Sequence, residues 1–100
     1  MTKLKLIFVT MSMASTAVLA DSGHYTATLA QALASRSTYV ANGNVWRCDG
    51  TGCVLASEPK DADSVRSCRA LTRFVGAVTA YGSEQEPFDG AKLAKCNAKG

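Results

Sequence analysis

The spacing of apolar residues changes along the chain, and each change predicts a different element. Between residues 37 and 56, short β-prone segments are separated by two clusters of turn residues. Asn42-Gly43 predicts a two-residue hairpin turn, because both residues tolerate a positive φ. Asp49-Gly50-Thr51-Gly52 predicts a four-residue loop and a second antiparallel return. Residues 37–56 are therefore predicted to form a three-stranded β-meander.

The register of this meander sorts its side chains. Cys48 faces Cys53 directly, at a separation from which a cross-strand disulfide can form. Because strand side chains alternate, two apolar faces result. The face of the bridge carries Tyr39, Trp46 and Leu55. The opposite face carries Val40, Val45, Val54 and Ala56. We therefore expect cover on both sides of the sheet, at least in part, with a helix on one of them.

Residues 63–75 have the period of a helix with one apolar arc. The arc carries Val65, Cys68, Leu71, Thr72 and Val75. Asp63 or Ser64 can cap its start, and Gly76 stands where a left-handed glycine ends a helix. Cys68 is therefore expected to point into the core.

The remaining elements complete a small α+β fold. Residues 77–82 predict a strand, and residues 89–97 predict a closing helix that is capped by Asp89. Its buried side carries Leu93 and Cys96. Residues 24–30 alternate weakly, which favours a strand, although an alanine-rich helix over 27–34 competes. We predict a small antiparallel sheet, with the strand alternative taken for 24–30, packed against helices 63–75 and 89–97.

Residues 1–20 have the features of a secretory signal peptide. Lys3 and Lys5 form a positive start, an apolar stretch follows, and Val18-Leu19-Ala20 fits a cleavage site. Polar residues interrupt the apolar run, which falls short of the ~20 residues that a membrane-spanning helix needs. We expect cleavage after Ala20, which leaves one domain over 21–100, periplasmic or secreted, with no stable membrane anchor.

Composition and charge exclude several classes of protein. The chain has 100 residues, 47% of them hydrophobic and 19% charged, which leaves room for one small domain and argues against disorder. The formal net charge of +3 falls to +1 when Lys3 and Lys5 leave with the leader. Because nucleic-acid binding calls for a clustered basic face, we expect no nucleic-acid partner.

One local cluster of positive charge stands out. Arg66, Arg69 and Arg73 recur at i, i+3 and i+7, so on a helix they form a stripe within about 60° of arc. The simpler interpretation is the solvated flank of an amphipathic helix, with Asp63 and Arg66 as an ion pair. The alternative is a surface that binds an anionic partner.

Four cysteines remain in the predicted mature chain: Cys48, Cys53, Cys68 and Cys96. An even number in a small exported domain favours disulfides. Three pairings are possible, and sequence alone does not fix one. We predict Cys48–Cys53 across the hairpin and Cys68–Cys96 between the two helices.

The cysteine segments resemble those of a known family. The pattern V-W-x-C-x-G-x-x-C over Val45–Cys53, the helix segment Val65–Leu71 and the closing Leu93–Asn97 are similar to a family of small exported alphaproteobacterial proteins of unknown function. The similarity covers nearly the whole mature chain. The resemblance implies an exported four-cysteine domain, and it implies no activity and no catalytic residue.

Catalytic chemistry finds little support in the residues. The only histidine, His24, lies close to the predicted mature N-terminus and is more simply an exposed strand residue than a base. The acidic side chains fall in predicted turns, loops or caps, where they have structural reasons to be. These are Asp49, Glu58, Asp61, Asp63, Glu84, Glu86 and Asp89. We therefore expect no enzymatic activity and no cofactor.

Metal and redox chemistry are the alternatives that involve the cysteines. Their spacings of four, fourteen and twenty-seven residues contain one close pair, whereas zinc ribbons use two. The loop 49–52 lacks the further acidic ligands of a calcium loop. A thiol–disulfide role for Cys48 and Cys53 remains the alternative function, although neither cysteine begins a helix, where a thiol pKa would fall.

The leading hypothesis is an exported structural or interaction module without an active site. It would present a sheet edge or the arginine stripe to an envelope protein, to peptidoglycan or to another anionic surface.

Overall fold

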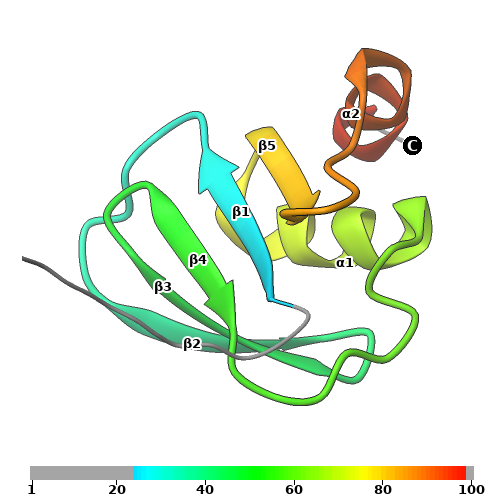
Figure 1. Ribbon diagram of the computed structural model, residues 1–100. Helices are drawn as coiled ribbons and strands as arrows, with labels where there is room; N and C mark the ends of the chain where they lie inside the picture. The colour runs from blue at the N-terminus through cyan, green and yellow to red at the C-terminus, as the bar shows by residue number, and fades with distance from the viewer. Residues whose placement is uncertain (1–23, 99–100) are drawn as a thin grey trace, which may run out of the picture.

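A computed structural model describes residues 24–98, which form one α+β unit (Figure 1). Its elements are β1 (Tyr25–Leu29), β2 (Ser37–Ala41), β3 (Asn44–Asp49), β4 (Gly52–Leu55), α1 (Val65–Val75), β5 (Val78–Ser83) and α2 (Gly90–Asn97). The predicted α+β class is confirmed. The predicted leader and its cleavage site lie outside the described residues.

The five strands form one antiparallel sheet in the order β2-β3-β4-β1-β5. β1 lies between β4 and β5, where Ala27 pairs with Cys53 on one side and with Tyr81 on the other. Ala27 and Leu29 are buried. The strand predicted over 24–30 is confirmed and the competing helix is wrong, because pairing on both sides outweighs the helical preference of alanine.

The meander has the predicted register with one correction. Asn42 and Gly43 adopt φ values of 53° and 81° in the first turn, and Cys48 faces Cys53. Asp49 pairs with Gly52, so the ladder continues past the cysteines. The predicted four-residue loop is therefore wrong: only residues 50 and 51 form the turn.

Both helices begin at a side-chain cap. The Ser67 N–H donates to Ser64 Oγ at 3.0 Å, which identifies Ser64 rather than Asp63 as the cap of α1. The Lys92 N–H donates to Asp89 Oδ1 at 2.9 Å at the start of α2. Gly76 ends α1 with φ 84° as predicted, but its ψ of −166° is extended rather than left-handed helical.

The core lies on one side of the sheet, where α1 contacts β2 and β5 and α2 contacts β5 (Figure 1). Trp46 and Tyr81 form its centre with ring centroids 5.6 Å apart, and Leu71 of α1 is also fully buried. On the opposite face, Val40 is 64% exposed and Val54 is 51% exposed. The expected helix on one face is confirmed, and both helices pack on that same side, so within the described residues the opposite face is covered less.

Two disulfides connect the elements as predicted. Cys48–Cys53 joins β3 to β4 with a Cα–Cα distance of 4.0 Å, and Cys68–Cys96 joins α1 to α2 with a Cα–Cα distance of 5.6 Å. Stable disulfides are typical of oxidising compartments. No helix within residues 24–98 is long and apolar enough to cross a membrane.

Candidate functional site

The three predicted arginines lie together on α1, on the face turned away from the core. Arg66 and Arg73 are exposed and Arg69 is half-buried. All three line a shallow hollow of about 670 Å³, together with Ala70 and Asn42. Asn42 belongs to the β2–β3 turn, so the fold places a neutral side-chain amide beside the row of guanidinium groups.

A polar network fixes the hairpin turn against α1. Asn42 Nδ2 donates to Ser67 Oγ at 2.7 Å, and the Ser67 hydroxyl donates to the Asp61 carbonyl at 2.6 Å. The Ser64 hydroxyl donates to the same carbonyl at 2.8 Å. Ser67 is fully buried. These hydrogen bonds therefore hold the β2–β3 turn beside the first turn of α1.

A second clamp holds the connector that leads into α1. The Lys60 N–H donates to Asn44 Oδ1 at 2.8 Å, and Asn44 Nδ2 donates to the Lys60 carbonyl at 3.0 Å. Asn44 is fully buried at the start of β3. A buried amide with both ends paired is favourable, whereas an unpaired one is costly, so this residue specifies the path of the connector.

The arginine row extends to a second hollow at the end of α1. Arg69 and Arg73 line this hollow of about 680 Å³ together with Gly76 and Ala77. Asn97 from α2 reaches its rim. The positive side chains therefore border both the β2 side and the C-terminal end of α1.

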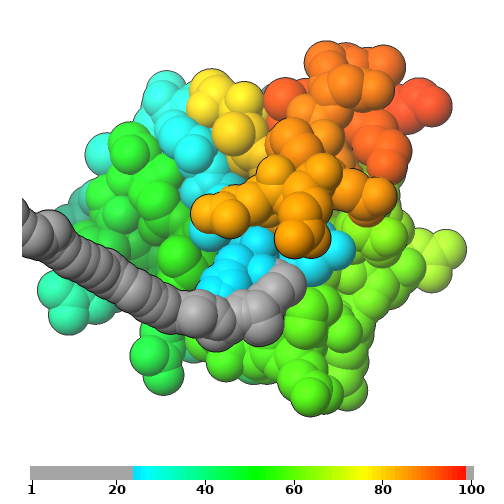
Figure 2. Space-filling view, in the orientation of Figure 1, coloured from blue at the N-terminus to red at the C-terminus, as the bar shows by residue number. Residues whose placement is uncertain are grey.

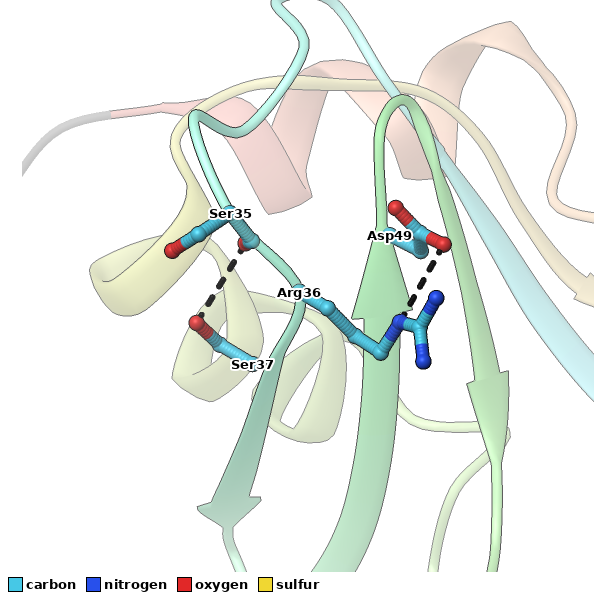
Figure 3. A network of polar contacts seen from close by, with 4 residues as sticks. All are labelled: Ser35, Arg36, Ser37 and Asp49. Carbon is cyan, nitrogen blue, oxygen red and sulfur yellow. Dashed lines mark hydrogen bonds and ion pairs between the residues drawn. The ribbon is translucent and has the colours of Figure 1, made fainter.

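The two exposed arginines of this face, Arg66 and Arg73, have no carboxylate partner among the described residues. Within residues 24–98, neither Arg66 nor Arg73 takes part in an ion pair, so the predicted Asp63–Arg66 pair is not formed. An ion pair does join Arg36 Nε to Asp49 Oδ2 at 3.4 Å, just before β2 (Figure 3). Both of these side chains are largely exposed, so this pair contributes little to stability.

An aromatic pair borders the arginine face. Phe74 packs on Tyr39 of β2 with ring centroids 5.2 Å apart, yet its side chain is 52% exposed. Phe74 falls outside the apolar arc that predicted the core face of α1. An exposed phenylalanine on a polar helix face was thus visible in the sequence, but its partner Tyr39 was not.

The cysteines are buried rather than reactive. All four lie in disulfides and are at most 1% exposed, so no cysteine thiolate is left to bind zinc and an attacking thiol has little access to a sulfur. Within residues 24–98, no group of three His, Cys, Asp or Glu side chains is placed to hold a metal ion. The acidic residues weighed as catalytic candidates are all exposed.

Tyr81 is the most strongly perturbed titratable group, but its role is structural. Burial raises the pKa of its phenol, and the nearby Tyr25, Asp63 and Asp61 raise it further. The hydroxyl donates to the Ala62 carbonyl at 2.7 Å inside the core. The hydroxyl proton of Tyr81 is therefore used in a hydrogen bond within the core.

Comparison with known proteins identifies a family and no characterised relative. No curated protein and no solved structure matches the sequence at a significant level. The model of one family matches residues 6–98, which is nearly the whole chain. The chain therefore belongs to this family, described as a family of unknown function (DUF8200).

Proposed function

We propose that the protein is an exported, non-catalytic interaction module that binds an anionic partner through the arginine face. The arginine face is defined by Arg66, Arg69 and Arg73 of α1 with Asn42 of the hairpin turn. The observation that carries the proposal is the shared hollow: cations that are three and four residues apart border one concave surface whose far wall is fixed by the Asn42–Ser67 hydrogen bond.

Guanidinium groups suit such a role. Each presents several donors in a planar fork that matches a carboxylate or a phosphate, and each stays charged at any physiological pH. The Asn42–Ser67 hydrogen bond holds the turn beside these groups, so an anion would meet a surface that is already formed. Export is supported by the leader-like segment and by the two disulfides.

The test is binding of a labelled polyglutamate to the disulfide-intact protein, measured by fluorescence anisotropy at low and at physiological salt. We expect binding that weakens with salt and is lost in R66E/R73E. The matched control is R36E/R47E, which changes the net charge equally away from the arginine face and should keep most of the binding. Equal losses in both variants would show a response to net charge only and would contradict the proposal.

The alternative function is thiol–disulfide exchange at Cys48 and Cys53, and the burial of both residues speaks against it. An insulin-reduction assay decides between the two functions. Turnover that disappears when Cys48 and Cys53 are replaced by alanine would favour the redox factor.

A further inference from the structure

The two edges of the sheet differ in how the chain covers them. At the β5 edge, the side chain of Asn97 pairs with Val78: the Val78 N–H donates to Oδ1 at 2.9 Å, and Nδ2 donates to the Val78 carbonyl at 2.8 Å. Farther along, the Phe88 N–H donates to the Tyr81 carbonyl at 2.8 Å. The segment that follows β5 lies over this side of the molecule (orange in Figure 2). The β5 edge is thus occupied by its own chain.

The β2 edge has no such cover within residues 24–98. On β3, the Val45 N–H donates to Ser57 Oγ at 3.1 Å, and its carbonyl accepts from the Ala56 N–H at 2.7 Å, both on the side away from β2. Val40 is paired with Val45, and paired antiparallel residues either exchange hydrogen bonds or both point away from each other. Val40, and Thr38 two residues earlier, therefore direct their backbone polar groups out of the free edge.

Nothing in β2 itself discourages a further strand. Natural edge strands are commonly protected by lysine, proline or a β-bulge. The sequence of β2, Ser-Thr-Tyr-Val-Ala, has no charge and no proline, and its pairing with β3 runs without a register shift from Ser37 to Ala41. Its residues are β-branched or aromatic at the three central positions, which favours extended pairing.

The side chains beside this edge define what an added strand should carry. Tyr39 and Ala41 face the helix side of the sheet, where the half-exposed Phe74 packs on Tyr39. The hollow between Arg66 and Arg73 begins at Asn42, directly after Ala41. An added strand would thus place one side chain beside Phe74 and, two residues away on the same face, another beside the arginines. An apolar and an acidic residue at those two positions complement the surface.

A second copy of the chain fits this edge less well. Antiparallel self-pairing of β2 about Tyr39 sets Asn42 of one copy opposite Arg36 of the other. That arrangement brings a further guanidinium to the end of β2 beside which Arg66 and Arg73 lie, and an added positive charge there is unfavourable.

We propose that the β2 edge binds an extended acidic segment of another protein as a sixth strand, with an apolar and an acidic residue two positions apart on its inner face. Backbone hydrogen bonds from Thr38 and Val40 would supply affinity, and the Phe74 and arginine contacts would supply specificity. This proposal rests on the proposed function of the arginine face and adds the class of partner and its conformation.

Two blocked peptides serve as probes in NMR titrations of the disulfide-intact, isotope-labelled protein. Acetyl-Thr-Glu-Thr-Leu-Thr-amide places leucine beside Tyr39 and glutamate beside Ala41 as an antiparallel strand, and its reversed sequence does so as a parallel strand. Binding should protect the Thr38 and Val40 amides from hydrogen exchange and leave the Tyr39 amide, already in the ladder, unchanged. R66E/R73E should weaken binding about tenfold, which corresponds to about 1.4 kcal/mol, and R36E/R47E should change it little.

Methylated peptides separate strand addition from simple charge attraction. When acetyl-Thr-Glu-Thr-Leu-Thr-amide pairs as an antiparallel strand, its threonine nitrogens face β2, whereas its leucine and glutamate nitrogens face away. The methylated peptides are therefore made from this sequence. Methylation of the threonine nitrogens should weaken binding at least tenfold, because it removes donors to the edge, and methylation of the other two should leave binding nearly intact.

Three results would overturn the proposal in distinguishable ways. Equal binding of both methylated peptides would refute strand addition, while the arginine face would still be supported as an anion-binding site. Binding that R66E/R73E leaves unchanged would remove the proposed function as well. Protection of Thr38 and Val40 without peptide, rising with protein concentration, would identify a second copy as the occupant.

Discussion

The two disulfides should contribute unequally to stability, because they close chain segments of very different length. Cys68 and Cys96 are 28 residues apart, whereas Cys48 and Cys53 are 5 apart. The loop-entropy relation gives about 3.6 kcal/mol for the longer closure and about 2.1 kcal/mol for the shorter one. All four cysteines are equally buried, so alanine pairs remove similar packing. The difference between the two double variants should therefore be at least the difference in chain entropy, about 1.5 kcal/mol.

The measurement compares C68A/C96A with C48A/C53A. For a domain of this size, about 1.5 kcal/mol corresponds to a difference in melting temperature of roughly 6–12 °C. Trp46 is the only tryptophan and is fully buried, so its fluorescence reports unfolding, with circular dichroism as a second probe. We expect the lower melting temperature for C68A/C96A. Equal losses, or a larger loss for C48A/C53A, would refute the entropic reasoning.

Three further predictions concern the core, pH and the leader. N44A should lower the free energy of unfolding by about 1–3 kcal/mol in urea titrations, because it leaves the backbone N–H and carbonyl of Lys60 unpaired. The control is Q31A at an exposed position, and an equal loss of stability in both variants would contradict this prediction. Since burial raises the pKa of Tyr81, stability should be intact below about pH 10 and fall at higher pH, and Y81F should reduce that alkaline loss; an unchanged slope would argue against it. Intact mass and N-terminal sequencing of the envelope form should show cleavage after Ala20, and retention of residues 1–20 would disprove export by this leader.

Local signals in the sequence predicted most of the elements. Asn42-Gly43 specified a hairpin, and that hairpin with its second turn specified which cysteines face each other. Asp89 indicated where α2 begins, and the neighbouring candidates Asp63 and Ser64 indicated the start of α1 to within one residue. These features depend on residues close together in the chain, where turn chemistry and alternation act directly.

Long-range pairing was not predictable in the same way. The insertion of β1 between β4 and β5 depends on pairs of distant residues such as Ala27 and Tyr81. Neither segment contains a local signal that identifies the other as its partner strand. The candidate site shows the same division. The arginine stripe follows from helical spacing. Its neighbour Asn42 comes from the hairpin turn, where its role in the turn already accounts for an asparagine, so the sequence offers no reason to assign it to the site. The bond from Asn42 to Ser67 spans 25 residues and has no local signature.

The longer disulfide also bears on the covered edge of the sheet. Cys96 precedes Asn97, whose side-chain amide occupies the backbone groups of Val78 on β5. The same bridge holds α2 to α1, so it fixes the position from which Asn97 reaches the edge. Loss of the Cys68–Cys96 bond therefore removes more than chain entropy: it loosens the cover of β5 and exposes a second edge that can pair with other chains. The chain thus secures the β5 edge covalently through α2, and within the described residues it leaves β2 as the edge available to a partner.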